Sequence, residues 1–67
     1  MDELKNRFTY HAPKVGQPEI YEKIRTIGFD FAIEIGALCP DSREKSLAIT
    51  KLEECVMWAN ASIARNE

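Results

Sequence analysis

Apolar residues recur along two long stretches of the chain with the period of an α-helix. In the first stretch they are spaced three or four positions apart, at Ile20, Ile24, Ile27, Phe31, Ile35 and Leu38. Pro18 suits the first position of a helix, where a missing N–H costs no hydrogen bond, and Pro40 stops the pattern. The spacing predicts a helix over residues 18–39. Gly28 and Gly36 lie inside it, where each either admits the close approach of another group or weakens the helix locally.

The second stretch contains no glycine or proline after Pro40 and carries a broader apolar face. Asp41 and Glu44 have the spacing of a capping box, in which each side chain bonds the backbone N–H of the other residue. The pattern predicts a helix over residues 42–65, antiparallel to the first because the connection between them is short. Its apolar positions form two neighbouring stripes: Ala48, Leu52, Cys55, Ala59 and Ile63, and beside them Ile49, Val56 and Ile63.

Residues 1–17 differ from both stretches and are expected to form an N-terminal arm. Residues 2–7 can form one turn of helix, and residues 8–10 are typical of a short extended run. Residues 11–18 contain two prolines and one glycine, which is the composition of a loop. We therefore expect a single all-α domain over residues 1–67, an antiparallel helical hairpin with a short N-terminal arm or helix.

A hairpin of this length has too little interior to be stable alone. In a chain of 67 residues, one core rarely contributes more than about 3–5 kcal/mol unless disulfides, a metal or partner subunits add to it. The only cysteines, Cys39 and Cys55, are expected on buried helix faces as small apolar residues. Several large apolar residues do not fit one seam between two helices, namely Phe29, Ile33, Ile49, Met57 and Trp58. We expect another copy of the chain to cover them, so that the domain forms a homo-oligomer.

Composition and motifs disfavour catalysis and polymer binding. The sequence has no glycine-rich phosphate loop, no metalloprotease or serine-hydrolase motif and only one histidine, so we expect no enzyme, no cofactor and no metal site. Glu53 and Glu54, near Lys51, are typical of a solvated helix face. The net charge of -2 disfavours binding to DNA or RNA polymers, and no apolar stretch is long enough to span a membrane.

The arm offers the clearest candidate binding groups. Phe8, Tyr10 and His11 lie beside Arg7 and Lys14 in the sequence. Aromatic rings can stack on nucleobases, and the neighbouring cations can bind phosphates. Alternatively, Phe8 and Tyr10 pack over the end of the hairpin.

Candidate groups on the two helices are less distinctive. Lys23 and Arg25 stand among acidic residues and resemble ordinary surface charges. Arg43 begins the second helix, where free N–H groups and a guanidinium can bind an anion, unless Arg43 pairs with a neighbouring carboxylate. Thr50 and Asn60 are polar residues on an otherwise apolar helix, and they are either interface groups or ligand contacts.

Three runs of residues stand out as motifs rather than as helical patterns. The first is RFTYH at residues 7–11, followed by Pro13, QPE at residues 17–19 and YE at residues 21–22. The second is DSREKSLA at residues 41–48, and the third comprises TKLEE, MWANA and IARN within residues 50–66. Together, over roughly residues 7–66, they resemble the hairpin domain shared by the phage anti-CBASS and anti-Thoeris nucleotide sponges.

The resemblance implies a function without catalysis. Members of this family are small helical phage proteins that assemble, often as hexamers, and sequester the cyclic nucleotide signals of bacterial immunity without cleaving them. The anti-CBASS branch binds cyclic di- and trinucleotides between protomers, and the anti-Thoeris branch binds a cyclic ADP-ribose isomer with the help of an N-terminal β-rich domain. About 17 residues precede the first long predicted helix, and we expect them to be too few for such a β-rich domain. The resemblance therefore favours the anti-CBASS branch. The implied location is the cytoplasm of the infected bacterial host.

The resemblance also implies two kinds of pocket. For cyclic dinucleotides, the matching residues are Phe8, Tyr10, His11, Lys23 and Arg25. Tyr10 best matches the family's N-terminal aromatic residue, and Arg25 is preferred over Lys23 as the basic residue of the first long helix. For cyclic trinucleotides, the matching residues are Arg43, Ser46 and Thr50. From the residues alone, the broad apolar face fits another class equally well, a helical oligomeric module that binds a host protein.

Overall fold

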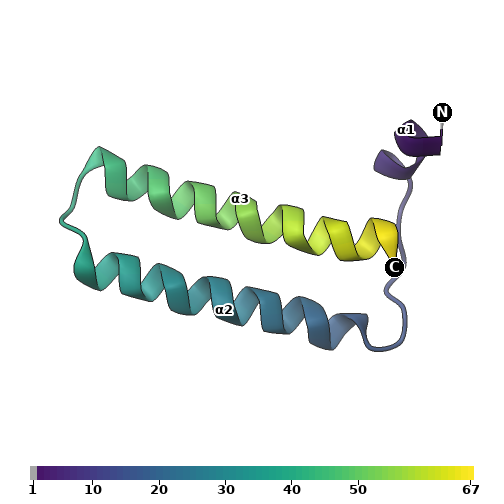
Figure 1. The fold of residues 1–67 in the computed structure, drawn as a ribbon, viewed down its shortest axis with the longest axis horizontal. Helices are drawn as coiled ribbons and strands as arrows, with labels where there is room; N and C mark the ends of the chain where they lie inside the picture. Colours follow the sequence, from purple (N-terminus) through teal and green to yellow (C-terminus); the bar gives the residue numbers. More distant parts are fainter. Residues whose placement is uncertain (1) are drawn as a thin grey trace.

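The computed structural model describes residues 2–67, and every regular element within them is a helix. The elements are α1 (Asp2–Arg7), α2 (Gln17–Leu38) and α3 (Arg43–Asn66). Figure 1 shows α2 and α3 side by side and antiparallel, with α1 beyond the C-terminal end of α3. The all-α hairpin predicted from the sequence is therefore confirmed, and the observed α2 and α3 differ by one residue at each end from the predicted ranges 18–39 and 42–65.

Backbone geometry at its two ends explains the length of α2. Gly16 precedes the helix at φ +86°, in the left-handed region that glycine adopts without a steric penalty. At the other end Cys39 is extended, at φ -101° and ψ 137°, because the proline that follows it disfavours helical geometry. The Cys39 N–H still donates to Ile35 O at 3.0 Å and so completes the last turn.

The start of α3 differs from the predicted capping box. The residue that caps the helix is Ser42, whose Oγ accepts the Lys45 N–H at 3.1 Å. Asp41 precedes the cap, and its carboxylate pairs instead with the Lys45 ammonium at 3.0 Å. The prediction of an Asp41–Glu44 box was wrong because two candidate N-cap residues are adjacent in the sequence, and the extended geometry at Ser42 selects the second.

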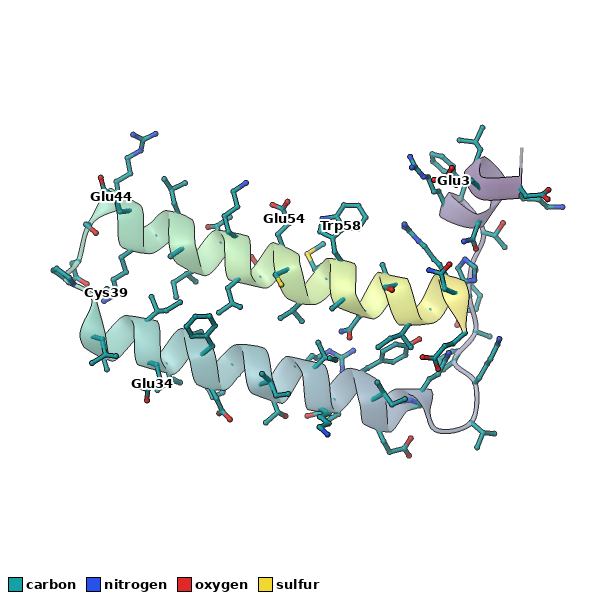
Figure 2. All side chains as sticks on the ribbon, in the orientation of Figure 1. Glu3, Glu34, Cys39, Glu44, Glu54 and Trp58 are labelled. Atoms are coloured by element: carbon teal, nitrogen blue, oxygen red, sulfur yellow. The ribbon has the colours of Figure 1, made fainter. Side chains whose placement is uncertain are left out.

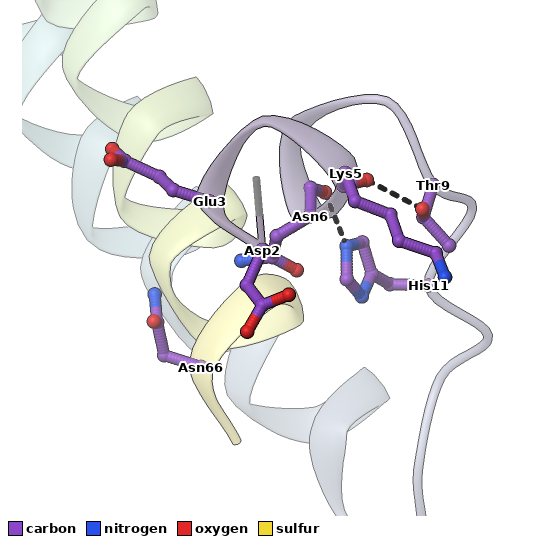
Figure 3. Close-up of a pocket in the computed structure, with 7 residues that line it drawn as sticks. All are labelled: Asp2, Glu3, Lys5, Asn6, Thr9, His11 and Asn66. Atoms are coloured by element: carbon purple, nitrogen blue, oxygen red, sulfur yellow. Dashed lines mark hydrogen bonds between the residues drawn. The ribbon is translucent and has the colours of Figure 1, made fainter.

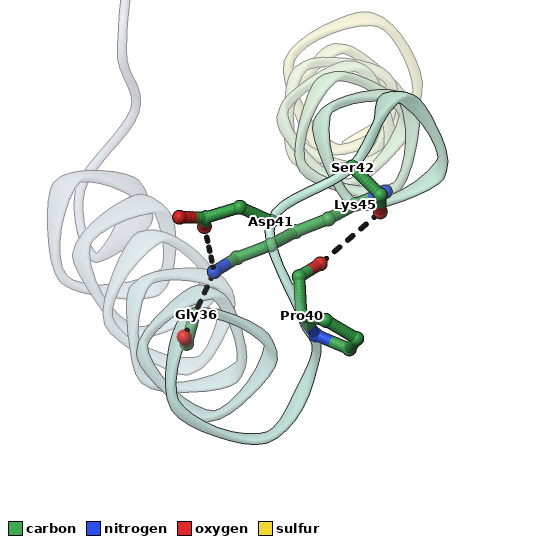
Figure 4. A network of polar contacts seen from close by, with 5 residues as sticks. All are labelled: Gly36, Pro40, Asp41, Ser42 and Lys45. Atoms are coloured by element: carbon green, nitrogen blue, oxygen red, sulfur yellow. Dashed lines mark hydrogen bonds and ion pairs between the residues drawn. The ribbon is translucent and has the colours of Figure 1, made fainter.

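A small polar network closes the turn between the long helices (Figure 4). Lys45 Nζ donates to Gly36 O, at the C-terminal end of α2, at 3.0 Å and contacts Asp41 Oδ1 at the same distance. The Ser42 hydroxyl donates to Pro40 O at 3.1 Å. Because the Lys45 side chain is only 19% exposed, these contacts occupy it in holding the two helices together.

At the seam between α2 and α3, the Val56 side chain packs into the space left by Gly28, where an added Cβ would lie 2.5 Å from Val56 Cγ2. Tyr21, Ile24, Ala32 and Ile35 of α2 are half-buried, and so are Ile49, Leu52, Val56, Ala59 and Ile63 of α3. Ile20, Ile27, Phe31 and Leu38, which belong to the predicted stripe on the first helix, are exposed. Cys39 and Cys55 are also exposed, so the expectation that they lie on buried faces was wrong. Cys39 ends α2 at the turn, and Cys55 lies outside the seam on α3.

The single chain has no hydrophobic core. Among residues 2–67, no hydrophobic side chain is fully buried. Figure 2 shows side chains standing off both long helices, with Trp58 and Glu54 pointing away from α2. The accessible surface is 5586 Å², whereas a compact monomer of this mass exposes about 4,300 Å². The excess exceeds the roughly 800 Å² that one partner buries in a standard protein interface.

Residues 2–67 contain neither a membrane-spanning helix nor a cluster of metal ligands. None of the helices within residues 2–67 is both long enough and apolar enough to cross a membrane. In the same part of the chain, no three acidic, histidine or cysteine side chains gather as metal ligands.

Replacing Gly28 by alanine should destabilise the hairpin. A Cβ at that position would lie 2.5 Å from Val56 Cγ2, and valine in a helix has one strongly preferred rotamer, so the helices must separate. We expect a loss of roughly 1–3 kcal/mol in urea unfolding at fixed protein concentration. Gly36→Ala is the matched control: nothing lies within 4 Å of its added Cβ, and it should stabilise α2 by about 0.5–1 kcal/mol. Equal effects of the two substitutions would contradict this account of the seam.

Candidate functional site

The N-terminal arm is attached to the C-terminal end of α3 by hydrogen bonds. Asn6 Nδ2 donates to Arg65 O at 3.3 Å, Gln17 Nε2 donates to Ile63 O at 3.5 Å, and the Lys14 ammonium donates to Glu67 O. The last carbonyl groups of a helix have no partner within the helix itself. The arm supplies a donor to Arg65 O, and it adds a second donor to Ile63 O, which already accepts the Glu67 N–H at 3.1 Å. These bonds set the position of the candidate site.

Gln17 is the centre of this attachment. Among the polar residues that the structure describes it alone is buried, with 3% of its surface exposed. The Gln17 side-chain Oε1 accepts the Lys14 backbone N–H at 2.9 Å and the Tyr21 hydroxyl at 3.2 Å. The Gln17 backbone N–H donates to Lys14 O at 3.0 Å. One amide side chain thus holds the loop, the first turn of α2 and the last turn of α3 together.

A cavity of about 270 Å³ forms where the arm meets the two long helices. Two of the predicted dinucleotide-binding residues, His11 and Arg25, line it together. The sequence had given no site role to Tyr21, which lies one helical turn before Arg25 and shares its face. The remaining lining residues are Pro13, Asn60, Ala61 and Ala64. We call this cavity the arm cleft.

Arg25 in the arm cleft is available to bind an anion. Its guanidinium is paired with the Glu22 carboxylate at 3.5 Å, and both side chains are more than half exposed. An exposed pair of this kind contributes about 0–1 kcal/mol. A phosphate that forms charge-assisted hydrogen bonds can therefore displace the carboxylate. His11 is more constrained, because its Nε2 donates to Asn6 O at 2.9 Å.

A larger and mostly apolar groove runs along the seam on the other side of Arg25. Its volume is about 710 Å³. Its lining residues are Arg25, Gly28, Phe29, Ala32, Ile49, Leu52, Glu53, Val56, Met57 and Asn60. We call it the seam groove. Arg25 and Asn60 line both the seam groove and the arm cleft, so the two hollows meet at these residues.

Asn60 has an unusual position at this junction. Its Oδ1 is buried, and within residues 2–67 no donor is placed to bond it. Leaving a buried amide oxygen without a donor costs roughly 1–3 kcal/mol. Asn60 stands out in the sequence as a polar residue on an otherwise apolar helix, and in the structure one of its polar atoms lacks a partner.

Phe8, also predicted for the dinucleotide site, lies in a separate cavity of about 420 Å³ with Arg7, Trp58 and Arg65. There the Arg65 guanidinium stacks 5.8 Å from the centre of the Trp58 ring. Tyr10 is 83% exposed and Lys23 is also exposed. In one copy of the chain, therefore, His11 and Arg25 come together, while Phe8 faces a different hollow.

A fourth hollow, of about 630 Å³, lies between α1 and the end of α3 and is unsuited to an anion (Figure 3). Asp2 and Glu3 place two carboxylates on its wall against the single ammonium of Lys5. Coulomb repulsion from these carboxylates disfavours a phosphate there. We therefore restrict the candidate site to the arm cleft and its junction with the seam groove.

The predicted trinucleotide residues lie at the opposite end of the hairpin from the arm (Figure 1). Arg43, Ser46 and Thr50 are exposed and spaced three and four positions apart, so they share one face of α3. Within residues 2–67 no carboxylate pairs with Arg43, and the alternative of a local ion pair is not observed. This face therefore presents an uncompensated guanidinium to solvent.

Substituting Gln17 by alanine should release the arm while leaving the hairpin closed. Lys14 N–H loses its acceptor, so its hydrogen exchange should accelerate by roughly 2- to 12-fold, the equivalent of one ordinary hydrogen bond. Tyr21→Phe is the control, because it removes the hydroxyl that donates to Gln17 Oε1 and keeps the bond from the Lys14 backbone N–H. If the Val56 amide in the seam exchanged faster to the same extent, Gln17 would be supporting the whole hairpin rather than the arm.

Comparison with known proteins gives one match. The family model described as Acb2/Tad1, hairpin domain, matches residues 1–64. Searches of curated proteins and of solved structures found no match. The match covers the arm, α2, α3 as far as Ala64, and every residue that lines the arm cleft.

Proposed function

This chain belongs to the Acb2/Tad1 hairpin-domain family, and on that basis we propose that it sequesters cyclic oligonucleotide immune signals in pockets between copies of itself. At the level of the family, these proteins are phage anti-defence sponges that bind cyclic-nucleotide signals. A sponge withdraws its ligand from the host and needs no catalytic group. The proposal extends this family-level function to particular ligands, particular residues and an assembly.

The observation that supports a site between copies is the absence of a hydrophobic core within residues 2–67. Exposed apolar side chains extend over both long helices, among them Ile27, Phe29, Phe31 and Trp58. Covering such surface is the usual driving force of assembly. We propose a homo-oligomer, a hexamer by analogy with the family, in which the open side of each hollow is closed by a neighbouring copy.

For cyclic dinucleotides we propose the arm cleft, with Arg25 binding a phosphate and His11 beside the base. Tyr10 is free to stack on a nucleobase, because its ring is 83% exposed in the single chain. Phe8 faces another hollow in one copy, and in the assembly it joins the pocket of a neighbour. Symmetric ligands suit this arrangement, since one residue type then makes the same contact from each subunit.

For cyclic trinucleotides we propose the outer face of α3 at Arg43, Ser46 and Thr50. Three copies of one guanidinium around a three-fold axis would match three phosphates. This gathering of charge reconciles an anionic ligand with a chain whose net charge is -2. Cyclic ADP-ribose isomers, the other ligand class of the family, are a further candidate for the same basic groups. We place this activity in the cytoplasm of the infected bacterial host.

Arg25 and Lys23 provide a matched test of the dinucleotide site. Arg25 lines the arm cleft and Lys23 does not, although both are exposed cations on α2. In native mass spectrometry with a panel of cyclic di- and trinucleotides, Arg25→Ala should weaken dinucleotide binding by roughly 10- to 150-fold, as expected for a charge-assisted bond. Lys23→Ala should bind like the wild type.

The same measurement tests the alternatives. Wild-type protein that binds no cyclic nucleotide but forms oligomers would contradict the sponge and favour a module that binds a host protein. Ligand released by heating should be the intact cyclic nucleotide; a linear product would show cleavage. Equal losses in Arg25→Ala and Lys23→Ala would leave the arm cleft without a specific role.

Arg43→Ala should weaken cyclic trinucleotide binding while dinucleotide binding is retained. The reason is distance, because Arg43 lies at the turn end of the hairpin and the arm cleft lies at the other end. Isothermal titration of one variant with both ligand classes measures the difference directly. A parallel loss of both ligands would indicate one shared pocket or a defect in assembly, and the oligomer mass distinguishes these two results.

A further inference from the structure

The strongest unexplained feature of the described chain is the amide of Asn60. Its Oδ1 is the one buried side-chain polar atom without a hydrogen-bond partner within residues 2–67. Every other buried or half-buried side-chain polar atom in this part of the chain has a bond or contact with solvent. Buried polar groups in native proteins are hydrogen-bonded as a rule, so this oxygen requires a donor from outside the single chain.

The position of Asn60 indicates where that donor comes from. With Arg25 it lines both the arm cleft and the seam groove. The other walls near it are apolar: Val56 lies one turn before it on α3, and Ala61 and Ala64 follow it. A ligand whose phosphate binds Arg25 therefore has its sugar and base near Asn60, which carries the side-chain amide among the residues that line these two hollows.

We propose that Asn60 Oδ1 accepts a hydrogen bond from the bound nucleotide, and that Asn60 is thereby a recognition residue of the arm cleft. This inference rests on the proposed function, since it assumes a nucleotide at Arg25. The complementary donor is an N–H of the nucleobase or a hydroxyl of the ribose. Both are polar donors carried by every ribonucleotide with an amino-substituted base, and phosphate oxygens cannot take their place because they only accept.

A second copy of the chain is the alternative source of the donor. The two sources predict opposite effects of an Asn60 substitution on the stability of the ligand-free assembly. If the ligand supplies the donor, the amide is unsatisfied in ligand-free protein. Replacing it by an apolar group of similar size then leaves the ligand-free assembly as stable as before or more stable. If a neighbouring copy supplies the donor, the same replacement weakens the ligand-free assembly, because it breaks a bond that is already made.

Asn60→Leu tests this difference in the 67-residue chain, with Asn60→Gln as the control that keeps an uncharged amide oxygen. For Asn60→Leu we expect an unchanged or higher melting temperature without ligand, an unchanged oligomer mass, and roughly 5- to 150-fold weaker binding of cyclic di-AMP. Asn60→Gln, which retains an acceptor without adding a charge, should lose less affinity. Asn60→Ala is measured as well, because leucine can overpack the junction, and it should show the same loss of affinity.

Ligand analogues identify the donor. Wild-type protein is titrated with cyclic di-AMP, with its 2′-deoxyribose analogue and with an analogue that lacks the base amino group. The analogue that lacks the true donor should bind more weakly to wild type, and Asn60→Leu should be insensitive to the same change. This non-additivity separates a direct hydrogen bond from a general disturbance of the pocket.

Three results would overturn the proposal. A lower melting temperature and a smaller oligomer for ligand-free Asn60→Leu and Asn60→Ala would assign the donor to a second copy. Unchanged affinity in all three variants would remove Asn60 from recognition while leaving the sponge intact. Failure of the wild type to bind any cyclic nucleotide would overturn the proposed function, and this inference with it.

Discussion

Two helices packed side by side can bury only the line along which they touch, and this geometric limit governs the rest of the molecule. The Cα atoms extend over 44 × 27 × 12 Å, with a radius of gyration of 14.8 Å, whereas a compact chain of this length has about 11 Å. A flat layer of this kind has two broad faces, and neither is covered within one copy. Apolar side chains on those faces lower the free energy only when another surface meets them.

The seam itself is held by shape and by a few polar contacts rather than by a core. Gly28 lets the Val56 side chain approach the backbone of α2, which a larger residue at that position would prevent. Lys45 joins the helices at the turn end, and Gln17 joins them to the arm at the other end. Both of these residues are polar, so their contacts fix geometry more than they add stability. The hairpin is thus well defined in shape but has no core of its own, and in the proposed homo-oligomer its stability comes from association.

The sequence predicted the elements better than their faces. Proline and glycine mark the ends of α2, so its range was predicted to within a residue. The face of α2 that packs was harder to predict, because apolar residues surround that helix and the choice depends on a glycine with no side chain. Two adjacent capping residues, Asp41 and Ser42, also left the start of α3 ambiguous. The resemblance named Arg25 and His11, which do come together. Asn60 stood out in the sequence as a polar residue on an apolar helix, but its place in the cleft, and any role for Tyr21, became apparent only when the arm was seen against the end of α3.

The attachment of the arm has a consequence for the order in which the protein is made. The arm is made before the rest of the hairpin, yet its hydrogen-bond acceptors are the carbonyl groups of Ile63, Arg65 and Glu67, which follow their donors by 46 to 59 residues. No intermediate length of nascent chain can therefore form the arm cleft, although α2 and the turn are free to fold earlier. Under the proposed function, binding at the arm cleft therefore waits until the end of α3 has been made.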